Sequence, residues 1–313
     1  RGGDELMATF TGQVASFVAL KSAIETTLAG RGWTLANGIL SKGVAFVQLT
    51  ATATELRLQA GTGQAGAALT GACPQSVKLL SFTNAPIQWP AVYVLHLFDV
   101  PDEIYVVLRY NVDRHQHLNW GVSSMPQIGG SGLWCSGTFR GDVDGTRAGV
   151  KSYIDTNSGT QFGAAPYDGF GLGFFFASIA GTYHSSFIHC GLEGAPAWRT
   201  NVGGNTGDLL GVSHKAGLLH ALPSQFNQAT VLLPIDILMA RQAQGQTIVA
   251  TLAHARYCRL DHLDLNQALI YGPERWMAYP LHALHPIQRN GVGWPIGGQH
   301  TGTFGIALRE VQP

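Results

Sequence analysis

The sequence contains twelve histidines, and two groups of them have a spacing that could bind a metal ion. His115 and His117 would share one face of a strand, and His282 and His285 are three residues apart, upstream of His300. A zinc site needs three or four converging ligands, ordinarily with carboxylate or thiolate help and a second shell. No acidic residue lies between His282 and His300. We therefore expect structural or interfacial histidines and no bound metal.

The remaining reactive residues do not form a recognisable catalytic constellation. Asp261, Asp264 and Glu274 could supply paired carboxylates, but acids at strand ends and turns are usually solvated. Residues 184–189 set two serines beside two histidines, which is too unspecific for a nucleophile and its base. The sequence has no P-loop, no G-x-S-x-G and no H-E-x-x-H motif. We predict no catalytic residues and a protein that is not an enzyme.

Gly61–Gly66 matches the G-x-G-x-x-G pattern of dinucleotide sites and follows a predicted strand. A dinucleotide site also requires an amphipathic helix next and an acidic residue about 20 positions on. Cys73-Pro74 interrupts any such helix, and the next acidic residue is Asp99. The pattern therefore indicates a glycine-rich turn, and no cofactor is predicted.

The composition indicates a subunit of an assembly. Only 12% of the 313 residues are charged, 45% are hydrophobic, and 40 are glycine. The 19 basic residues balance the 19 acidic ones, which argues against nucleic-acid binding, because such proteins normally carry a basic excess. So little charge protects a monomer poorly from association, so we expect a homo-oligomer or contacts with other proteins. No apolar stretch approaches the length of a membrane span, and no export signal is apparent.

Four widely spaced cysteines, at 73, 135, 190 and 258, include no C-x-x-C pair. We expect them to be free, mostly buried thiols of a protein made in a reducing cytoplasm. At the N-terminus, Arg1–Leu6 precede Met7. We expect residues 1–6 to be a non-native extension from an over-extended gene assignment, although a tag remnant or fragment end explains them equally well.

The periodicity of apolar residues predicts one helix followed by many strands. Val14, Phe17, Leu20, Ile24 and Leu28 recur at helical spacing, which predicts an amphipathic helix over residues 12–30. The pattern then changes to period two. The expected strands include a half-buried one at 55–59, a hairpin at 91–100 and 103–112, and a strand at 116–123. Later strands are expected at 230–241, 247–260, 269–270, 276–281 and 303–309.

Between these strand-rich parts, residues 129–226 are rich in Gly, Asn, Asp, Thr and Ser. The predicted organisation is a helix plus β-rich part at 7–128, a Gly-rich loop and contact region at 129–226, and a C-terminal β-rich part at 227–313 that completes the core. Short strands separated by turn signals favour a mainly β fold, with an antiparallel sandwich or barrel-like core, one N-terminal helix and a long Gly-rich loop region.

Several stretches, taken in order, carry a resemblance to a known group of proteins. They are Gly32-Trp33-Thr34, Leu40–Gly43, Leu233-Pro234-Ile235, His254–Arg259, Arg275–Pro280 and His300–Arg309. This order resembles a poorly characterised family of virion structural proteins of tailed bacteriophages, often encoded among tail genes. The resemblance implies a place in the virion tail beside other tail proteins. Its motifs are structural, so it implies no active-site residue.

Aromatic residues in loop-rich or strand-end contexts are candidate contact residues. They are Trp134, Tyr153, Tyr167, Trp198 and Trp294. Large rings near flexible glycine segments are typical of interface anchors, whereas packing in the core is the alternative explanation.

Three functional hypotheses are compatible with the sequence. The leading hypothesis is a non-enzymatic component of the phage tail, in the tip, baseplate or fibre-attachment region. The second is a β-sandwich module that binds host-surface glycan through aromatic residues and loop amides of residues 129–226. The third, less favoured, is a cell-wall hydrolase that uses Asp or His residues not recognisable from sequence.

Overall fold

The computed structural model of the chain describes twelve segments, on which everything below rests. They are residues 7–83, 86–112, 114–125, 128–141, 186–192, 194–200, 209–210, 230–241, 245–260, 263–264, 267–281 and 304–310. The described part is mainly β, with one helix and antiparallel strand pairings, as the sequence predicts.

The helix begins later than predicted. Residues 7–14 form β1 (Met7–Val14), which pairs along its whole length with β9, and α1 follows at Phe17–Ala29. The side chain of Ser16 caps the helix by accepting the amide of Ala19 at 3.2 Å, which sets the starting point. The buried face of the helix contains the apolar residues whose spacing predicted it, from Phe17 to Leu28.

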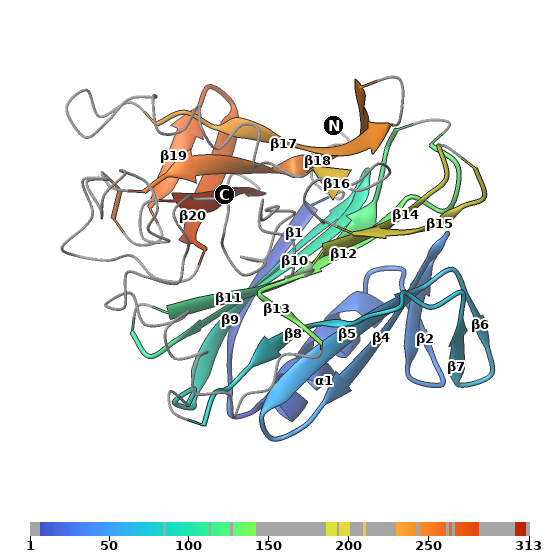
Figure 1. Ribbon diagram of the computed structural model, residues 1–313. Coiled ribbons are helices and arrows are strands. Elements are labelled where there is room, and N and C mark those ends of the chain that lie inside the picture. The colour runs from blue at the N-terminus through green and yellow to red at the C-terminus, as the bar shows by residue number, and fades with distance from the viewer. Residues whose placement is uncertain are drawn as a thin grey trace.

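Three sheets are stacked in layers (Figure 1). The middle layer, here the central sheet, consists in spatial order of β1, β9 (Ala91–Asp99), β10 (Asp102–Tyr110), β11 (Arg114–Val122), β12 (Leu133–Gly137), β14 (Ser186–Cys190) and β15 (Ala197–Thr200). The predicted hairpin at 91–112 is therefore confirmed as β9 and β10.

The helix-side sheet covers one face of the central sheet together with α1. Its order is β13 (Phe139–Arg140), β8 (Val77–Leu80), β5 (Glu55–Gly61), β4 (Ala45–Ala51), β3 (Ile39–Lys42) and β2 (Thr34–Ala36). A separate hairpin, β6 (Gly63–Ala65) and β7 (Ala68–Thr70), follows β5. The G-x-G-x-x-G stretch runs from Gly61, the last residue of β5, through β6, and its last glycine, Gly66, lies in the turn to β7 at a φ of +62°.

The C-terminal sheet covers the opposite face. Its order is β16 (Leu209–Leu210), β17 (Leu233–Arg241), β18 (Gly245–Arg259), β21 (Phe304–Glu310), β20 (Glu274–Pro280) and β19 (Ala268–Tyr271). The five later strands that the sequence predicts correspond to β17, β18, β19, β20 and β21.

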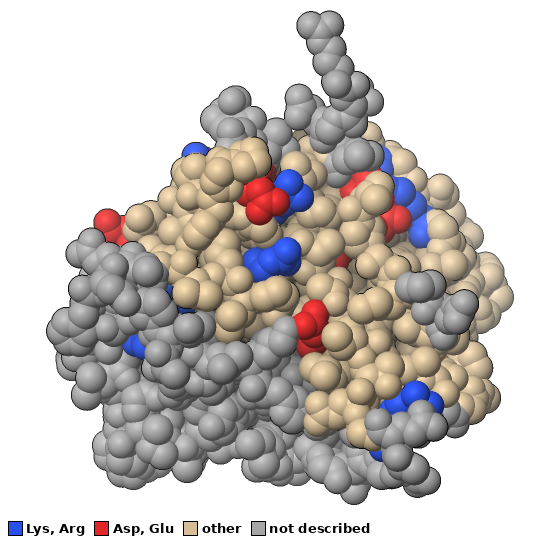
Figure 2. Space-filling view, turned by 90° about the horizontal axis from the view of Figure 1, so that it is seen from above, with Lys and Arg blue, Asp and Glu red and all other residues tan. Residues whose placement is uncertain are grey.

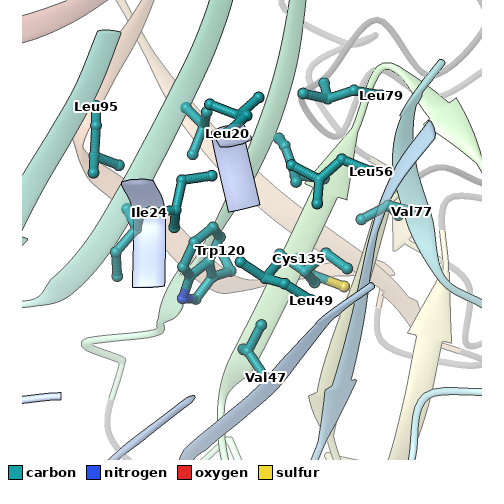
Figure 3. Packing of buried hydrophobic residues seen from close by; sticks show 14 of the residues in the cluster. Leu20, Ile24, Val47, Leu49, Leu56, Val77, Leu79, Leu95, Trp120 and Cys135 are labelled. Atoms are coloured by element: carbon teal, nitrogen blue, oxygen red, sulfur yellow. The ribbon is translucent and has the colours of Figure 1, made fainter. Parts of the chain in front are cut away.

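The central sheet is buried on both faces, and this explains its sequence. On the first face, Leu95, Trp120 and Cys135 pack against α1 and the helix-side sheet, in what we call the first core (Figure 3). On the second face, Tyr105 and Trp134 pack against the C-terminal sheet, in the second core. Strands covered on both sides are apolar at consecutive positions, whereas β5 alternates because it is half-buried.

The predicted loop character of residues 129–226 does not hold for the part that the structure describes. β12, β14 and β15 extend the central sheet, and β13 pairs with β8. Here glycine serves close packing: a Cβ on Gly137 would lie 2.8 Å from the side chain of Val77 and 2.9 Å from the backbone nitrogen of Lys78. Residues 142–185, which carry much of the predicted contact region, lie outside the described residues.

Candidate functional site

Trp134 is a core residue, so the prediction that it is a surface contact is wrong. Its side chain is only 1% exposed and belongs to the second core, where its ring lies 6.0 Å from that of Tyr105. It also covers Gly121, whose missing Cβ would fall 2.7 Å from the indole. The neighbouring glycines suggested a loop, but Trp134 lies in β12, a strand that is covered on both faces. Tyr153, Tyr167 and Trp294 lie outside the described residues.

Trp198 lies at the edge of the central sheet, on β15, and is partly exposed. Its indole N–H donates to the carbonyl oxygen of Gly71 at 2.8 Å, and its ring lies 5.3 Å from that of His189. The side chain therefore joins the edge of the central sheet to the segment after β7. Of the predicted contact residues that are described, this is the one whose ring reaches the surface.

The histidine and serine near this edge are engaged by the backbone. The Nδ1 atom of His189 accepts the amide of Ser131 at 3.0 Å, with the Ser131 hydroxyl at 3.2 Å. An Nδ1 atom that already accepts a backbone N–H is a poor base for that hydroxyl. Ser186, from the predicted serine–histidine group, shares a buried hydrogen bond with Ser136 instead, at 2.7 Å.

The histidines of β11 lie inside the fold. His115 and His117 are both buried, and the Nε2 atom of His117 lies 2.8 Å from the carbonyl oxygen of Pro280. Because a carbonyl only accepts, Nε2 carries the proton and is not available to a metal. Across the described segments no three His, Cys, Asp or Glu side chains gather in a way that could hold a metal ion. His282, His285 and His300 lie outside those segments.

A buried carboxylate joins the central and C-terminal sheets. Glu103, at the start of β10, is 1% exposed. One of its oxygens accepts the amide of Ala253 at 2.8 Å, and the other accepts the amide of His254 at 3.0 Å. The second oxygen also accepts the hydroxyl of Tyr105 at 2.7 Å. We call this group, with Arg256, the polar junction.

The polar junction exists because β18 bulges. Pro234 is opposite Arg256, but the next residue, Ile235, is opposite Leu252, so residues 253–255 have no partner on β17. Glu103 accepts two amides of this bulge, while the Nη1 atom of Arg256 donates to carbonyl oxygens on both sides of it. Those carbonyls belong to Leu252, Ala253 and Ala255, at 3.0, 3.0 and 2.8 Å. A buried carboxylate and a guanidinium thus satisfy the backbone groups that the bulge leaves unpaired.

Burial controls the protonation of the polar junction. Burial raises the pKa of Glu103 to about 7, against the effect of its three hydrogen bonds and the charge of Arg256. Burial also lowers the pKa of His254 to about 4, so the imidazole is neutral at pH 7. This ring stacks on Phe98 with centroids 4.0 Å apart, and its Nε2 lies 3.1 Å from the carbonyl oxygen of Val100. Both carboxylate oxygens are engaged within the core, which is the geometry of a structural group.

The outer face of the C-terminal sheet carries a mixed ionic and aromatic group. The Arg256 guanidinium lies 4.9 Å from the ring centre of Trp276, whose indole N–H donates to Glu274 at 3.2 Å. Arg309 pairs with the same carboxylate at 3.2 Å, whereas Asp261 lies outside the described residues. On the described part of the face seen in Figure 2, charged side chains lie as single residues or small groups among uncharged ones.

Sequence reasoning did not identify Glu103. The available signal was an acidic residue at the start of a run that is otherwise apolar, Ile104 to Leu108. A charged residue in such a run either lies at a strand end or is buried with hydrogen-bond partners. The backbone partners of Glu103, Ala253 and His254, lie about 150 positions away in the sequence, so the sequence alone does not reveal them.

Within the described part of the chain, no helix is both long enough and apolar enough to cross a membrane. Comparison of the sequence with protein-family models and with curated proteins gives no match.

Proposed function

We propose that the protein is a non-enzymatic structural component of the virion of a tailed bacteriophage, located in the tail at its tip, baseplate or fibre-attachment region. The resemblance of its ordered motifs to tail-associated virion proteins suggests the place. The observation that carries the assembly role is the uncharged edge of the C-terminal sheet, along which no strand pairs among the described residues.

That edge is β19, whose four residues Ala268–Tyr271 carry no charge and no proline. The Ile270 side chain is 59% exposed, and Tyr271 is exposed as well. Monomeric proteins usually protect edge strands with charges, proline or bulges, because a free edge pairs with other chains. The end strand of the helix-side sheet, β2, is also uncharged and exposes Leu35.

The register of β19 directs backbone groups outward. Tyr271 and Glu274 close the two-residue turn between β19 and β20, and the amide of Ala278 donates to the carbonyl oxygen of Gln267 at 3.3 Å. Residues 267, 269 and 271 therefore bond toward β20, so that the N–H and C=O groups of Ala268 and Ile270 point away from it. An added antiparallel strand would bond to these two residues.

The ionisable groups of the interior support a structural role. Glu103 and Arg256 satisfy a strand bulge, and His117 binds a carbonyl oxygen between two sheets. These are tasks of packing and orientation that account for their burial without a reaction.

Electron microscopy of virions tests the proposal. Particles purified from a lysate of the producing bacterium should bind antibodies raised against this protein at the tail. Absence of both the label and the protein from purified particles would contradict a virion role.

Trp198 favours a second candidate function, the recognition of host-surface glycan. Its partly exposed ring at the edge of the central sheet resembles the aromatic surfaces on which sugars stack. Binding to a glycan array that is lost in Trp198→Ala, with an unchanged fold, would support this function over a purely structural one.

A further inference from the structure

The turn between β2 and β3 has the sequence Asn37-Gly38, and both residues are exposed. Ala36 is paired with Ile39, so these two residues alone form the turn. Their φ angles are +53° and +78°, both in the left-handed region, as in the type I′ turns that favour this dipeptide. The same dipeptide places a side-chain amide next to a main-chain nitrogen that no following side chain shields.

The surroundings of the turn leave both reacting groups accessible. The amide nitrogen of Gly38 has no hydrogen-bond partner among the described residues, and a Cβ on Gly38 would meet nothing within 4 Å. The side chain of Asn37 makes one hydrogen bond, in which Nδ2 donates to the carbonyl oxygen of Gly66 on the neighbouring β6–β7 turn at 3.4 Å. This distance is long for an N–H···O bond, so the side chain is only weakly restrained.

The contact between the two hairpins, which lie side by side, does not depend on Asn37 (Figure 1). The Nε2 atom of Gln64 donates to the carbonyl oxygen of Ala36 at 3.2 Å and to that of Gly66 at 2.7 Å. The β2–β3 turn can therefore change its chemistry and its local geometry while Gln64 keeps the hairpins together.

We propose that Asn37 is a site of spontaneous deamidation, at which the side-chain amide is converted to a carboxylate without an enzyme. Asparagine is among the thermolabile residues, and a glycine after it leaves the main-chain nitrogen open to the side chain. The inference stands on the exposed turn and does not depend on the proposed function.

The reaction is an intramolecular substitution followed by hydrolysis. The peptide between Asn37 and Gly38 rotates out of the turn geometry, which the open surroundings of Gly38 permit. Once solvent hydroxide has removed its proton, the Gly38 nitrogen attacks Cγ of Asn37 and closes a five-membered succinimide ring. The bond from Cγ to Nδ2 breaks, and Nδ2 leaves as ammonia with a proton from solvent.

Water then opens the ring at one of its two carbonyl carbons. Opening at Cγ gives aspartate, whereas opening at the main-chain carbonyl carbon gives isoaspartate, in which the chain runs through Cγ. The protein gains one water and loses one ammonia in total, and nothing is oxidised or reduced.

The product carries a charge that these hairpins otherwise lack. No charged residue lies between Arg31 and Lys42 or between Arg57 and Lys78, the two stretches that contain the turns. A carboxylate at position 37 accepts but does not donate, so it loses the hydrogen bond to the carbonyl oxygen of Gly66 and repels that oxygen. Deamidation therefore produces a more acidic form of the protein that ion exchange can separate.

Asn111 is the internal comparison, because it also lies in a turn with a left-handed φ, +46°. The next residue is Val112, whose branched side chain shields its own amide nitrogen. The side-chain amide of Asn111 is also held at both atoms: Oδ1 accepts the amide of Gln88 at 2.8 Å, and Nδ2 donates to the carbonyl oxygen of Pro86 at 3.0 Å. We expect no reaction at Asn111 in the time that Asn37 needs.

The test incubates the purified full-length protein for weeks at mildly alkaline pH, well below its unfolding temperature, and then maps its tryptic peptides. Peptide 32–42 contains Asn37 and no other asparagine. Its mass should rise by about one mass unit, the difference between water and ammonia, and chromatography should resolve an isoaspartate and an aspartate product. Peptide 110–114, which contains Asn111, should keep its mass. The Asn290-Gly291 dipeptide lies outside the described residues and falls in a different peptide.

Two variants and a synthetic peptide complete the experiment. Asn37→Gln lengthens the side chain so that attack would need a larger ring, and its peptide should not gain mass. Gly38→Ala shields the nitrogen and should slow the reaction severalfold. The proposal would be overturned if peptide 32–42 of the wild-type protein stays unchanged in an incubation that deamidates the same peptide free in solution. An equal mass gain at Asn111, or aspartate as the sole product, would also overturn it.

Discussion

The carboxylate of Glu103 accepts the backbone amide of His254 at 3.0 Å, and this contact joins the central sheet to the C-terminal sheet across 151 positions of sequence. The same carboxylate satisfies the amide of Ala253, so a single side chain supports the bulge of β18 from the opposite layer. A polar group buried between the two layers therefore contributes to their stacking, as does the hydrogen bond of His117 to the carbonyl oxygen of Pro280.

The protonation of Glu103 gives the fold a pH dependence of defined sign. Its pKa rises from an ordinary 4.5 to about 7 in the folded protein, so between these values the folded state holds a proton that the unfolded state has lost. The contribution of Glu103 to the free energy of unfolding is fully present below pH 4.5 and is lost as the pH rises through 7. The total loss is about 3 kcal/mol. Glu103→Gln should lack this change.

Urea denaturation of the wild-type protein and Glu103→Gln from pH 4.5 to pH 8 isolates the contribution of Glu103. The pH-dependent contributions of all other ionisable groups are the same in both proteins, so they cancel in the difference between the two unfolding free energies. As the pH rises, the unfolding free energy of the wild-type protein should fall relative to that of Glu103→Gln. A difference that is constant over this range would show that Glu103 does not hold a proton in the folded protein.

Trp134 and Trp198 should respond differently to truncation. Trp134→Ala removes a ring from the second core and should reduce the free energy of unfolding by about 3 to 5 kcal/mol. Trp198→Ala removes a partly exposed ring and one hydrogen bond, which should cost about 1 to 2 kcal/mol. Chemical denaturation measures both, and equal small losses would mean that Trp134 is not packed in the core.

Gly137 should not tolerate a methyl group. In Gly137→Ala, the new Cβ would meet the backbone of Lys78 at 2.9 Å, and backbone cannot move aside as a flexible side chain can. We expect a loss of about 1 to 3 kcal/mol of unfolding free energy. Gly30→Ala is the matched control, because its Cβ would have 3.5 Å of clearance at an ordinary helical φ of −72°. Thermal unfolding of the two variants should separate them, and a Gly137→Ala protein as stable as the control would refute the close approach of β12 to β8.

The sequence was informative where structure is local. The spacing from Phe17 to Leu28 identified α1, and Pro101-Asp102 marked the turn between β9 and β10. The three-layer arrangement was not apparent, because the apolar runs of β9 and β10 show that both faces are covered but not by which elements. Trp134 was misassigned because nearby glycines suggested a loop, although Gly121 and Gly137 allow close packing.

The polar junction depends on contacts that are distant in the chain. Glu103 is explained only by a bulge in β18, and a bulge of three residues leaves no clear mark in the sequence of that strand.

The most direct test of assembly through β19 compares the sedimentation of two lysine variants with that of the wild-type protein over a range of concentrations. Ile270→Lys places a charge on the edge strand β19, whereas Val18→Lys places one on the outer face of α1, where the exposed fraction of the side chain is similar, 56% for Val18 against 59% for Ile270. Neither change should alter the free energy of unfolding by more than about 0.5 kcal/mol. The account predicts that the wild-type and Val18→Lys proteins associate as concentration rises, while Ile270→Lys remains a monomer. A wild-type protein that is monomeric at every concentration, or an Ile270→Lys variant that associates as the wild type does, would contradict it.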